Sequence, residues 1–169
     1  MISALIIVEG LTDRAFIEGI IEKFEAKGEV KFMRGNKPEK VSRLLKTYAG
    51  EFNQAIILKD LHRDGRDTTT LINKLTNGIR RLEKQGLRSH IIVVKRSIES
   101  WILAGLCVNN PENIPDPEEE LKRLIQKTGR HFIKSAEVYK RLAKEVDIEK
   151  AVKKSETFKS FIELLQSAH

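Results

Sequence analysis

The stretch ISALIIVEGLTD, Ile2 to Asp13, decides the fold class. Its first seven residues form an apolar run that only Ser3 interrupts, and this length and composition are typical of a strand buried on both faces. Glu9-Gly10 follows at once, and apolar residues at helical spacing begin after Thr12, a suitable N-cap residue. A strand, an acidic turn and a helix in this order begin a βαβ unit.

The same alternation continues outward from this stretch. Short apolar strands are expected at 30–33, 55–58 and 90–94, with helices between them and a charged loop from 59 to 67. This order predicts an α/β fold: a parallel sheet of about four strands flanked by helices.

Beyond residue 108 the pattern changes. Residues 109–117 hold three of the four prolines, and the later segments are helical in pattern, with Ser135, Asp147 and Ser155 as expected N-caps. We therefore expect an α/β domain over 1–108 and a helical C-terminal extension over 109–169 that packs on the same domain.

The composition of the 169 residues excludes several classes of protein. Hydrophobic residues make up 40% and charged residues 33%, which suits a water-soluble core-forming chain, and no apolar run is long enough to cross a bilayer. The single cysteine, Cys107, can form no internal disulfide and cannot build a zinc site alone. We therefore expect the protein to work in the reducing cytoplasm.

The net charge of +7 is unevenly distributed. Residues 1–111 hold 19 Lys and Arg against 13 Asp and Glu, whereas residues 112–169 hold 12 against 11. A basic excess suits a phosphate-rich partner such as nucleic acid, because neutralised phosphates release counterions. A solvated lysine-rich surface is the alternative explanation.

Acidic residues follow three of the four expected strands. Glu9 and Asp13 follow the first, Asp60 and Asp64 the third, and Glu99 the fourth. In open α/β sheets, functional groups gather beyond the carboxyl ends of the strands, so these side chains are expected at one edge. Clustered carboxylates without cysteine or histidine ligands favour Mg²⁺, Mn²⁺ or Ca²⁺. Each acid taken alone is better explained as a cap or turn residue, and only their joint occurrence after three strands favours a shared site.

Three motifs resemble those of Toprim domains. Ile6–Asp13, IIVEGLTD, resembles the opening strand with its glutamate and glycine, and Asp60–Gly65, DLHRDG, resembles the second motif, in which aspartates at alternating positions precede a glycine. Ser97–Ala104, SIESWILA, is similar to an element of small stand-alone Toprim proteins related to the OLD-family nucleases, and the tail over 127–158 resembles their helical end. The resemblance covers nearly the whole chain and implies a Toprim-like fold.

The resemblance also implies roles for the acids. Glu9 would be a metal ligand or the general acid/base, Asp60 and Asp64 would hold Mg²⁺ or Mn²⁺, and Glu99 would be a further ligand. Asp13 would be auxiliary. These roles suit phosphodiester cleavage, which needs a cation on the phosphoryl oxygens and an activated water.

One position departs from the Toprim pattern: His62 stands where the second aspartate of the pair is usual. Histidine is a poor Mg²⁺ ligand but can bind Mn²⁺ or move a proton. Four nearby cations, Arg63, Arg66, Lys95 and Arg96, are candidates for binding the scissile phosphate.

The sequence thus predicts a divalent-metal-dependent protein that processes nucleic-acid phosphodiester bonds, as a nuclease does. Two alternatives stay open. One is a non-catalytic nucleic-acid-binding module that retains the Toprim fold, and the other is an interaction module that assembles with a larger partner.

Overall fold

The computed structural model describes the chain except residues 1–3, 33–37, 49, 62–67, 85 and 168–169. It contains one four-stranded sheet in the order β2-β1-β3-β4, and all neighbouring strands are parallel. The strands are β1 (Ala4–Val8), β2 (Gly28–Phe32), β3 (Gln54–Leu61) and β4 (Arg88–Lys95). The expected α/β fold class, with a parallel sheet flanked by helices, is confirmed.

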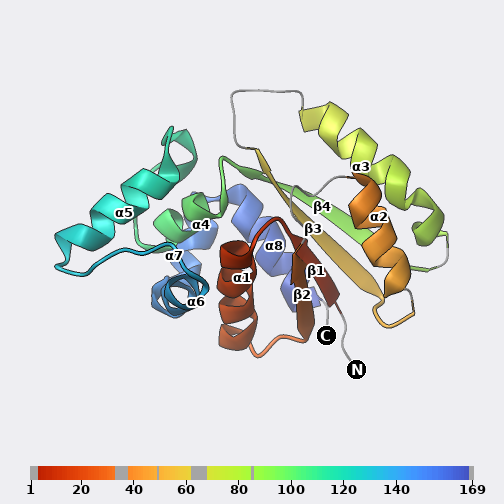
Figure 1. Cartoon of the computed structure of the whole chain (residues 1–169), viewed down its shortest axis with the longest axis horizontal. Coiled ribbons are helices and arrows are strands. Elements are labelled where there is room, and N and C mark those ends of the chain that lie inside the picture. Colours follow the sequence, from red (N-terminus) through yellow and green to blue (C-terminus); the bar gives the residue numbers. More distant parts are fainter. Residues whose placement is uncertain (1–3, 33–37, 49, 62–67, 85, 168–169) are drawn as a thin grey trace.

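Helices cover both faces of the sheet (Figure 1). One face carries α2 (Pro38–Thr47) and α3 (Thr68–Glu83). The other carries α1 (Leu11–Lys23) and a helical continuation: α4 (Ile98–Gly105), the 3₁₀ turn η2 (Pro111–Asn113), α5 (Pro117–Lys127), α6 (Ala136–Glu145), α7 (Ile148–Lys154) and α8 (Glu156–Ser167).

The alternation along β1 explains why its apolar run has no polar position. Ile6 and Val8 belong to the core cluster under α1 and the C-terminal helices, whereas Leu5 and Ile7 belong to the cluster under α2 and α3. Successive side chains of a strand point to opposite faces, and both faces are covered here. The larger cluster also contains Trp101 and side chains of α5 to α8, so the C-terminal extension shares the core of the sheet domain.

Several expected boundaries are wrong by a few residues. α1 has Gly10, not Thr12, as its N-cap, and β3 continues through Leu61 into the expected loop because it pairs with β4 along its whole length. The expected caps Ser135 and Asp147 are confirmed, since their side chains accept hydrogen bonds from the N–H groups of Val138 and Lys150. Among the described residues, no helix has the length and apolar content needed to span a membrane.

Candidate functional site

A pocket of about 350 Å³ opens at the carboxyl ends of β1 and β3, and we call it the acidic pocket. Its walls come from the start of α1, the end of β3, the turn before α4, the start of α5 and the loop before α6. Its acidic side chains are Glu9, Asp13, Asp60, Glu99, Asp116 and Glu118. The sequence-predicted acids Glu9, Asp13, Asp60 and Glu99 therefore lie in one place, as the parallel sheet requires.

Glu9 is the residue that connects the two central strands. β1 and β3 are neighbours, and the backbone N–H of Asp60 donates to Glu9 Oε2 at 3.3 Å. The Lys59 ammonium forms an ion pair with Glu9 Oε1. The adjacent strand ends expected for Glu9 and Asp60 are thus observed, and two donors from β3 hold the Glu9 carboxylate.

Asp13 lies in the first turn of α1, where its carboxylate accepts a hydrogen bond from the backbone of Gly10. Burial and then the charges of Glu99 and Glu9 raise the pKa of Asp13 from 3.8 to about 7. The negative charge of a carboxylate is costly where water is excluded and like charges are near. Asp13 is therefore poised to exchange a proton near neutral pH.

Asp60 is a second acid of the pocket whose pKa is raised. It is the seventh residue of β3 and pairs in register with Val94 of β4, so its backbone is fixed by the sheet. Burial raises the pKa of Asp60 well above its usual range, and the charges of Asp13, Glu9 and Glu99 add to the effect. A cation bound here would relieve this repulsion.

Glu99 is buried, with only 3% of its surface exposed, and receives two donors from the C-terminal extension. The Tyr139 hydroxyl of α6 donates to Glu99 Oε1 at 2.7 Å, and the Lys134 ammonium lies 3.5 Å from the same oxygen. Burial and the Glu99 charge raise the pKa of Tyr139, so its hydroxyl keeps its proton and donates. Burial opposes the charge of Lys134, but Glu99 and Glu118 outweigh it and raise the pKa of its ammonium.

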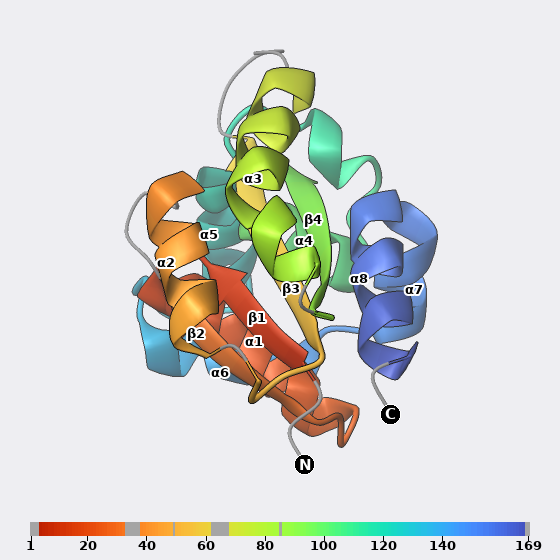
Figure 2. The ribbon, with the colours of Figure 1, turned by 90° about the vertical axis from the view of Figure 1, so that its right-hand side faces the viewer.

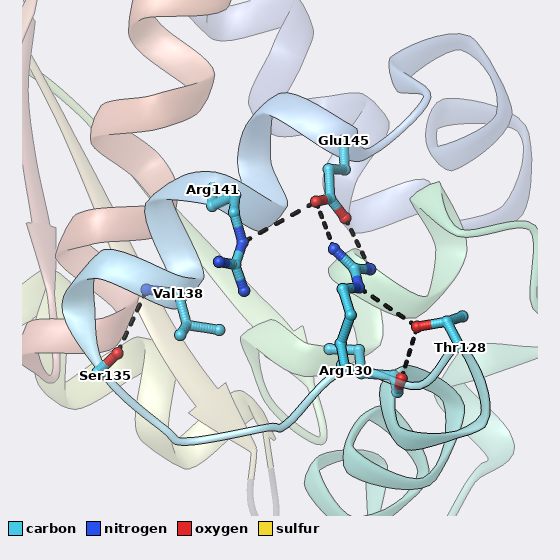
Figure 3. A network of polar contacts seen from close by, with 7 residues as sticks. Thr128, Arg130, Ser135, Val138, Arg141 and Glu145 are labelled. Atoms are coloured by element: carbon cyan, nitrogen blue, oxygen red, sulfur yellow. Dashed lines mark hydrogen bonds and ion pairs between the residues drawn. The ribbon is translucent and has the colours of Figure 1, made fainter.

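An ion-pair network holds the loop that carries Lys134. Arg130 donates to both carboxylate oxygens of Glu145 on α6, at 2.7 and 3.2 Å, and its Nε donates to Thr128 Oγ1 at 3.3 Å (Figure 3). Lys134 also reaches Glu118 on α5 at 3.0 Å. The loop is thus held between α5 and α6, and the Lys134 ammonium is kept at the wall of the acidic pocket.

Carboxylate oxygens are the ligands that a hard divalent cation prefers, and several carboxylates line the pocket. Four carboxylates act on one another there, and burial raises the pKa of two of them, which is the condition that Mg²⁺ or Mn²⁺ binding relieves. Over the described ranges, however, no three Asp, Glu, His or Cys side chains converge as a ready-made metal site. Lys59 and Tyr139 instead occupy oxygens of Glu9 and Glu99.

Of the four cations predicted to bind phosphate, the structure describes two, and only one of these lines the acidic pocket. Arg96 lines the acidic pocket and adopts a left-handed backbone with φ of 70°. Lys95 does not line it, because its exposed side chain turns to Glu112, with the charged atoms 3.5 Å apart. Four further candidates lie outside the described residues: His62, Arg63, Asp64 and Arg66.

Sequence reasoning missed the side chains that hold the acids. Lys59 was assigned to a loop, although its place beside Asp60 at the end of an apolar strand was a usable signal. Tyr139 and Lys134 lie 40 and 35 positions after Glu99, and no spacing rule connects them to it.

No family model matches the chain, and a search of curated proteins finds no match either.

Proposed function

We propose that the chain is a Toprim-type protein that cleaves nucleic-acid phosphodiester bonds with the help of a divalent cation. The observation that carries the proposal is that Glu9, Asp13, Asp60 and Glu99 line one pocket, with the pKa values of Asp13 and Asp60 raised. Perturbed carboxyls gathered in a pocket are typical of functional sites rather than of solvated surfaces. The single cysteine suits work in the reducing cytoplasm.

Asp60, Asp13 and Glu99 would hold Mg²⁺ or Mn²⁺. When bound, the cation supplies charge neutralisation for the phosphoryl oxygens and polarises water. The reaction is hydrolysis: the water oxygen bonds to phosphorus, the bond from phosphorus to the leaving sugar oxygen breaks, and that oxygen receives a proton from solvent water. Glu9, fixed by Lys59 and the Asp60 N–H, accepts the proton of the attacking water in this proposal.

Lys134 and Arg96 supply positive charge to the wall of the pocket. Lys134 comes from the loop before α6 and Arg96 from the turn before α4. Fixed cations beside a phosphoryl group stabilise the charge that develops on its oxygens in the transition state. Lys134 is held by Glu99 and Glu118, so it is in place before the substrate binds.

The binding-module alternative is favoured by one specific observation. Glu9 and Glu99 are engaged by Lys59, Tyr139 and Lys134, as they would be in a pocket whose acids have a purely structural role. In that case the pocket binds no cation, and the chain binds nucleic acid without cleaving it.

Nuclease assays with matched variants test the proposal. Wild type, Asp60→Asn and Glu137→Gln are incubated with plasmid and single-stranded DNA in Mg²⁺, Mn²⁺ or EDTA. Glu137→Gln removes one exposed acid of α6 away from the pocket and serves as the charge control. We expect cleavage by wild type and Glu137→Gln only with a divalent cation, and a loss of orders of magnitude in Asp60→Asn.

Calorimetric titration with Mn²⁺ separates the two functions. Heat of binding in wild type that disappears in Asp60→Asn supports the cation site independently of turnover. Equal cleavage by wild type and Asp60→Asn would contradict the proposal. Absence of both cleavage and Mn²⁺ binding, in variants with unchanged thermal unfolding, would favour the binding module.

A further inference from the structure

The helices α2 and α3 carry an unusual share of the positive charge. Residues 38–48 and 68–88, which contain them, hold eight Lys and Arg against two Glu, while the whole chain has a net charge of +7. The two helices lie side by side in front of the sheet (Figure 2). They form a single layer over one sheet face, and we call its outer surface the basic layer.

Apolar and polar positions are separated on both helices. On α3, Leu75 and Ile79 are buried against the sheet, whereas the polar residues are exposed, namely Asn73, Lys74, Asn77, Arg80 and Glu83. On α2, Val41 and Leu45 are buried and the cations are exposed. The exposed cations of the basic layer are Lys40, Arg43, Lys46, Lys74 and Arg80, together with Lys84 in the turn that follows α3.

None of these six cations forms an ion pair within the part of the chain that the structure describes. The opposite layer differs, because acids there neutralise many of its cations. Arg130 pairs with Glu145 (Figure 3), and Lys140 pairs with Glu22 across α6 and α1 at 2.8 Å. Among the described residues, α2 and α3 therefore carry a group of cations that no nearby acid neutralises.

The acidic pocket alone does not attract nucleic acid, so binding of a polyanion requires a basic surface elsewhere on the protein. It contains six acidic side chains and two basic ones, so on its own it repels a polyanion. Helices that connect parallel strands start at the edge where the strands end, so α2 and α3 begin at the edge of Glu9 and Asp60. A polyanion lying along the basic layer thus meets the pocket edge.

We propose that the basic layer is the surface that binds the nucleic-acid backbone and delivers it to the acidic pocket, an inference that rests on the proposed function. From Lys74 to its end at Glu83, α3 rises about 14 Å, which corresponds to about four phosphate steps along one duplex strand. Exposed Asn73 and Asn77 add neutral groups that hydrogen-bond to phosphate and sugar oxygens. Contacts of this kind fix position without reading sequence.

The basic layer suits nucleic acid better than an anionic membrane. Surface helices that bind membranes insert large apolar side chains beside their cations. Among the described residues, the exposed large hydrophobics are Leu11 and Ile133, and neither belongs to α2 or α3. The layer therefore offers charge and amide groups but no apolar insertion.

A pair of charge-matched triple variants tests the proposal. The layer variant is Lys74→Gln/Arg80→Gln/Lys84→Gln. The control variant, Lys127→Gln/Lys150→Gln/Lys153→Gln, removes the same charge from exposed positions of α5 and α7. Fluorescence anisotropy measures binding of a fluorescein-labelled 20-mer, single-stranded or duplex, in EDTA at several salt concentrations, and thermal unfolding checks the fold of each variant.

We expect the layer variant to bind at least 10-fold more weakly than wild type at low salt, and the control variant to stay within about 3-fold. The slope of log affinity against log salt should fall by about 2 to 3 in the layer variant, since each lost phosphate contact on duplex DNA removes about 0.9. A second variant, Lys40→Gln/Arg43→Gln/Lys46→Gln, should show the same loss from α2.

Three results would overturn the proposal: equal losses in the layer and control variants, no binding by wild type, or binding to phosphatidylserine vesicles in place of DNA. Hydrolysis of bis(p-nitrophenyl) phosphate with Mn²⁺ separates this inference from the pocket function, because that small diester needs no extended surface. If the diester is hydrolysed in an Asp60-dependent way but the layer variant binds DNA as wild type does, only the proposed role of the basic layer is refuted. If the layer variant loses DNA binding but no Asp60-dependent hydrolysis is found, only the proposed function of the acidic pocket is refuted.

Discussion

Asp13→Asn changes one carboxyl of the acidic pocket into an uncharged group of the same shape, and its effect on stability should depend on pH. The Asp13 carboxyl has a pKa of about 7 in the folded protein, against 3.8 for an ordinary aspartate. At a pH well below 3.8 the carboxyl is protonated in both the folded and the unfolded chain, so it does not affect stability. As pH rises from 4 through 7, the unfolded chain releases this proton more readily, so the folded state loses stability.

The separation between 3.8 and about 7 corresponds to roughly 4 kcal/mol of unfolding free energy at 1.36 kcal/mol per pH unit. Partial exposure of the side chain lets water relax around the charge, so we expect about 2 to 3 kcal/mol in practice. The asparagine oxygen can still accept the backbone hydrogen bond from Gly10, so the first turn of α1 should be retained.

Urea unfolding in EDTA at pH 5, 6.5 and 8, followed by the fluorescence of Trp101, measures this difference. Wild type should lose stability between pH 5 and pH 8, and Asp13→Asn should gain about 2 kcal/mol over wild type at pH 8 but much less at pH 5. Glu137→Gln should follow wild type at every pH. If the free energy of unfolding changes with pH in the same way for wild type and Asp13→Asn, ionisation of Asp13 does not destabilise the folded protein and the reasoning is refuted.

Tyr139→Phe removes the buried donor to Glu99 and should lower the free energy of unfolding by about 1 to 3 kcal/mol, measured by urea unfolding. Gly19→Ala would place a Cβ atom 2.5 Å from the Cβ of Ala143, so α1 and α6 must separate, and thermal unfolding should show a loss of about 1 to 3 kcal/mol. Lys134→Gln should reduce any cleavage by on the order of 100-fold, while DNA binding by anisotropy stays within about 3-fold. His62→Asp restores the acidic pattern of the Toprim motif, and calorimetric titration should show tighter Mg²⁺ binding.

The sheet could be predicted because its signal is local. Each strand is a short apolar run and each crossover helix has its own stripe, as with Leu75 and Ile79 on α3. The ends of elements were less predictable, because they depend on pairing partners. β3 continues through Asp60 to Leu61 since β4 is long enough to pair with it, a fact that no local pattern contains.

The acids of the candidate site could be predicted from topology, whereas their partners could not. Parallel strands bring Glu9 and Asp60 to one edge wherever the helices lie. Tyr139 reaches Glu99 only because α6 packs against α1, and that packing depends on side-chain fit between distant segments, such as Gly19 against Ala143. Patterns in sequence specify which face of a helix is buried but not which helix covers it.

The net charge of +7 hides a separation of charge between the acidic pocket and the basic layer. The topology of the sheet explains why the acids and the cations lie in different places. The carboxyl ends of β1 and β3 gather acids in a pocket where the pKa values of Asp13 and Asp60 are raised. The basic layer over α2 and α3 places on one face of the same sheet cations that form no ion pair among the described residues. A polyanion that the basic layer attracts is repelled by the acidic pocket until a cation neutralises the acids. Binding to the basic layer should therefore occur in EDTA, whereas entry into the acidic pocket should require Mg²⁺ or Mn²⁺.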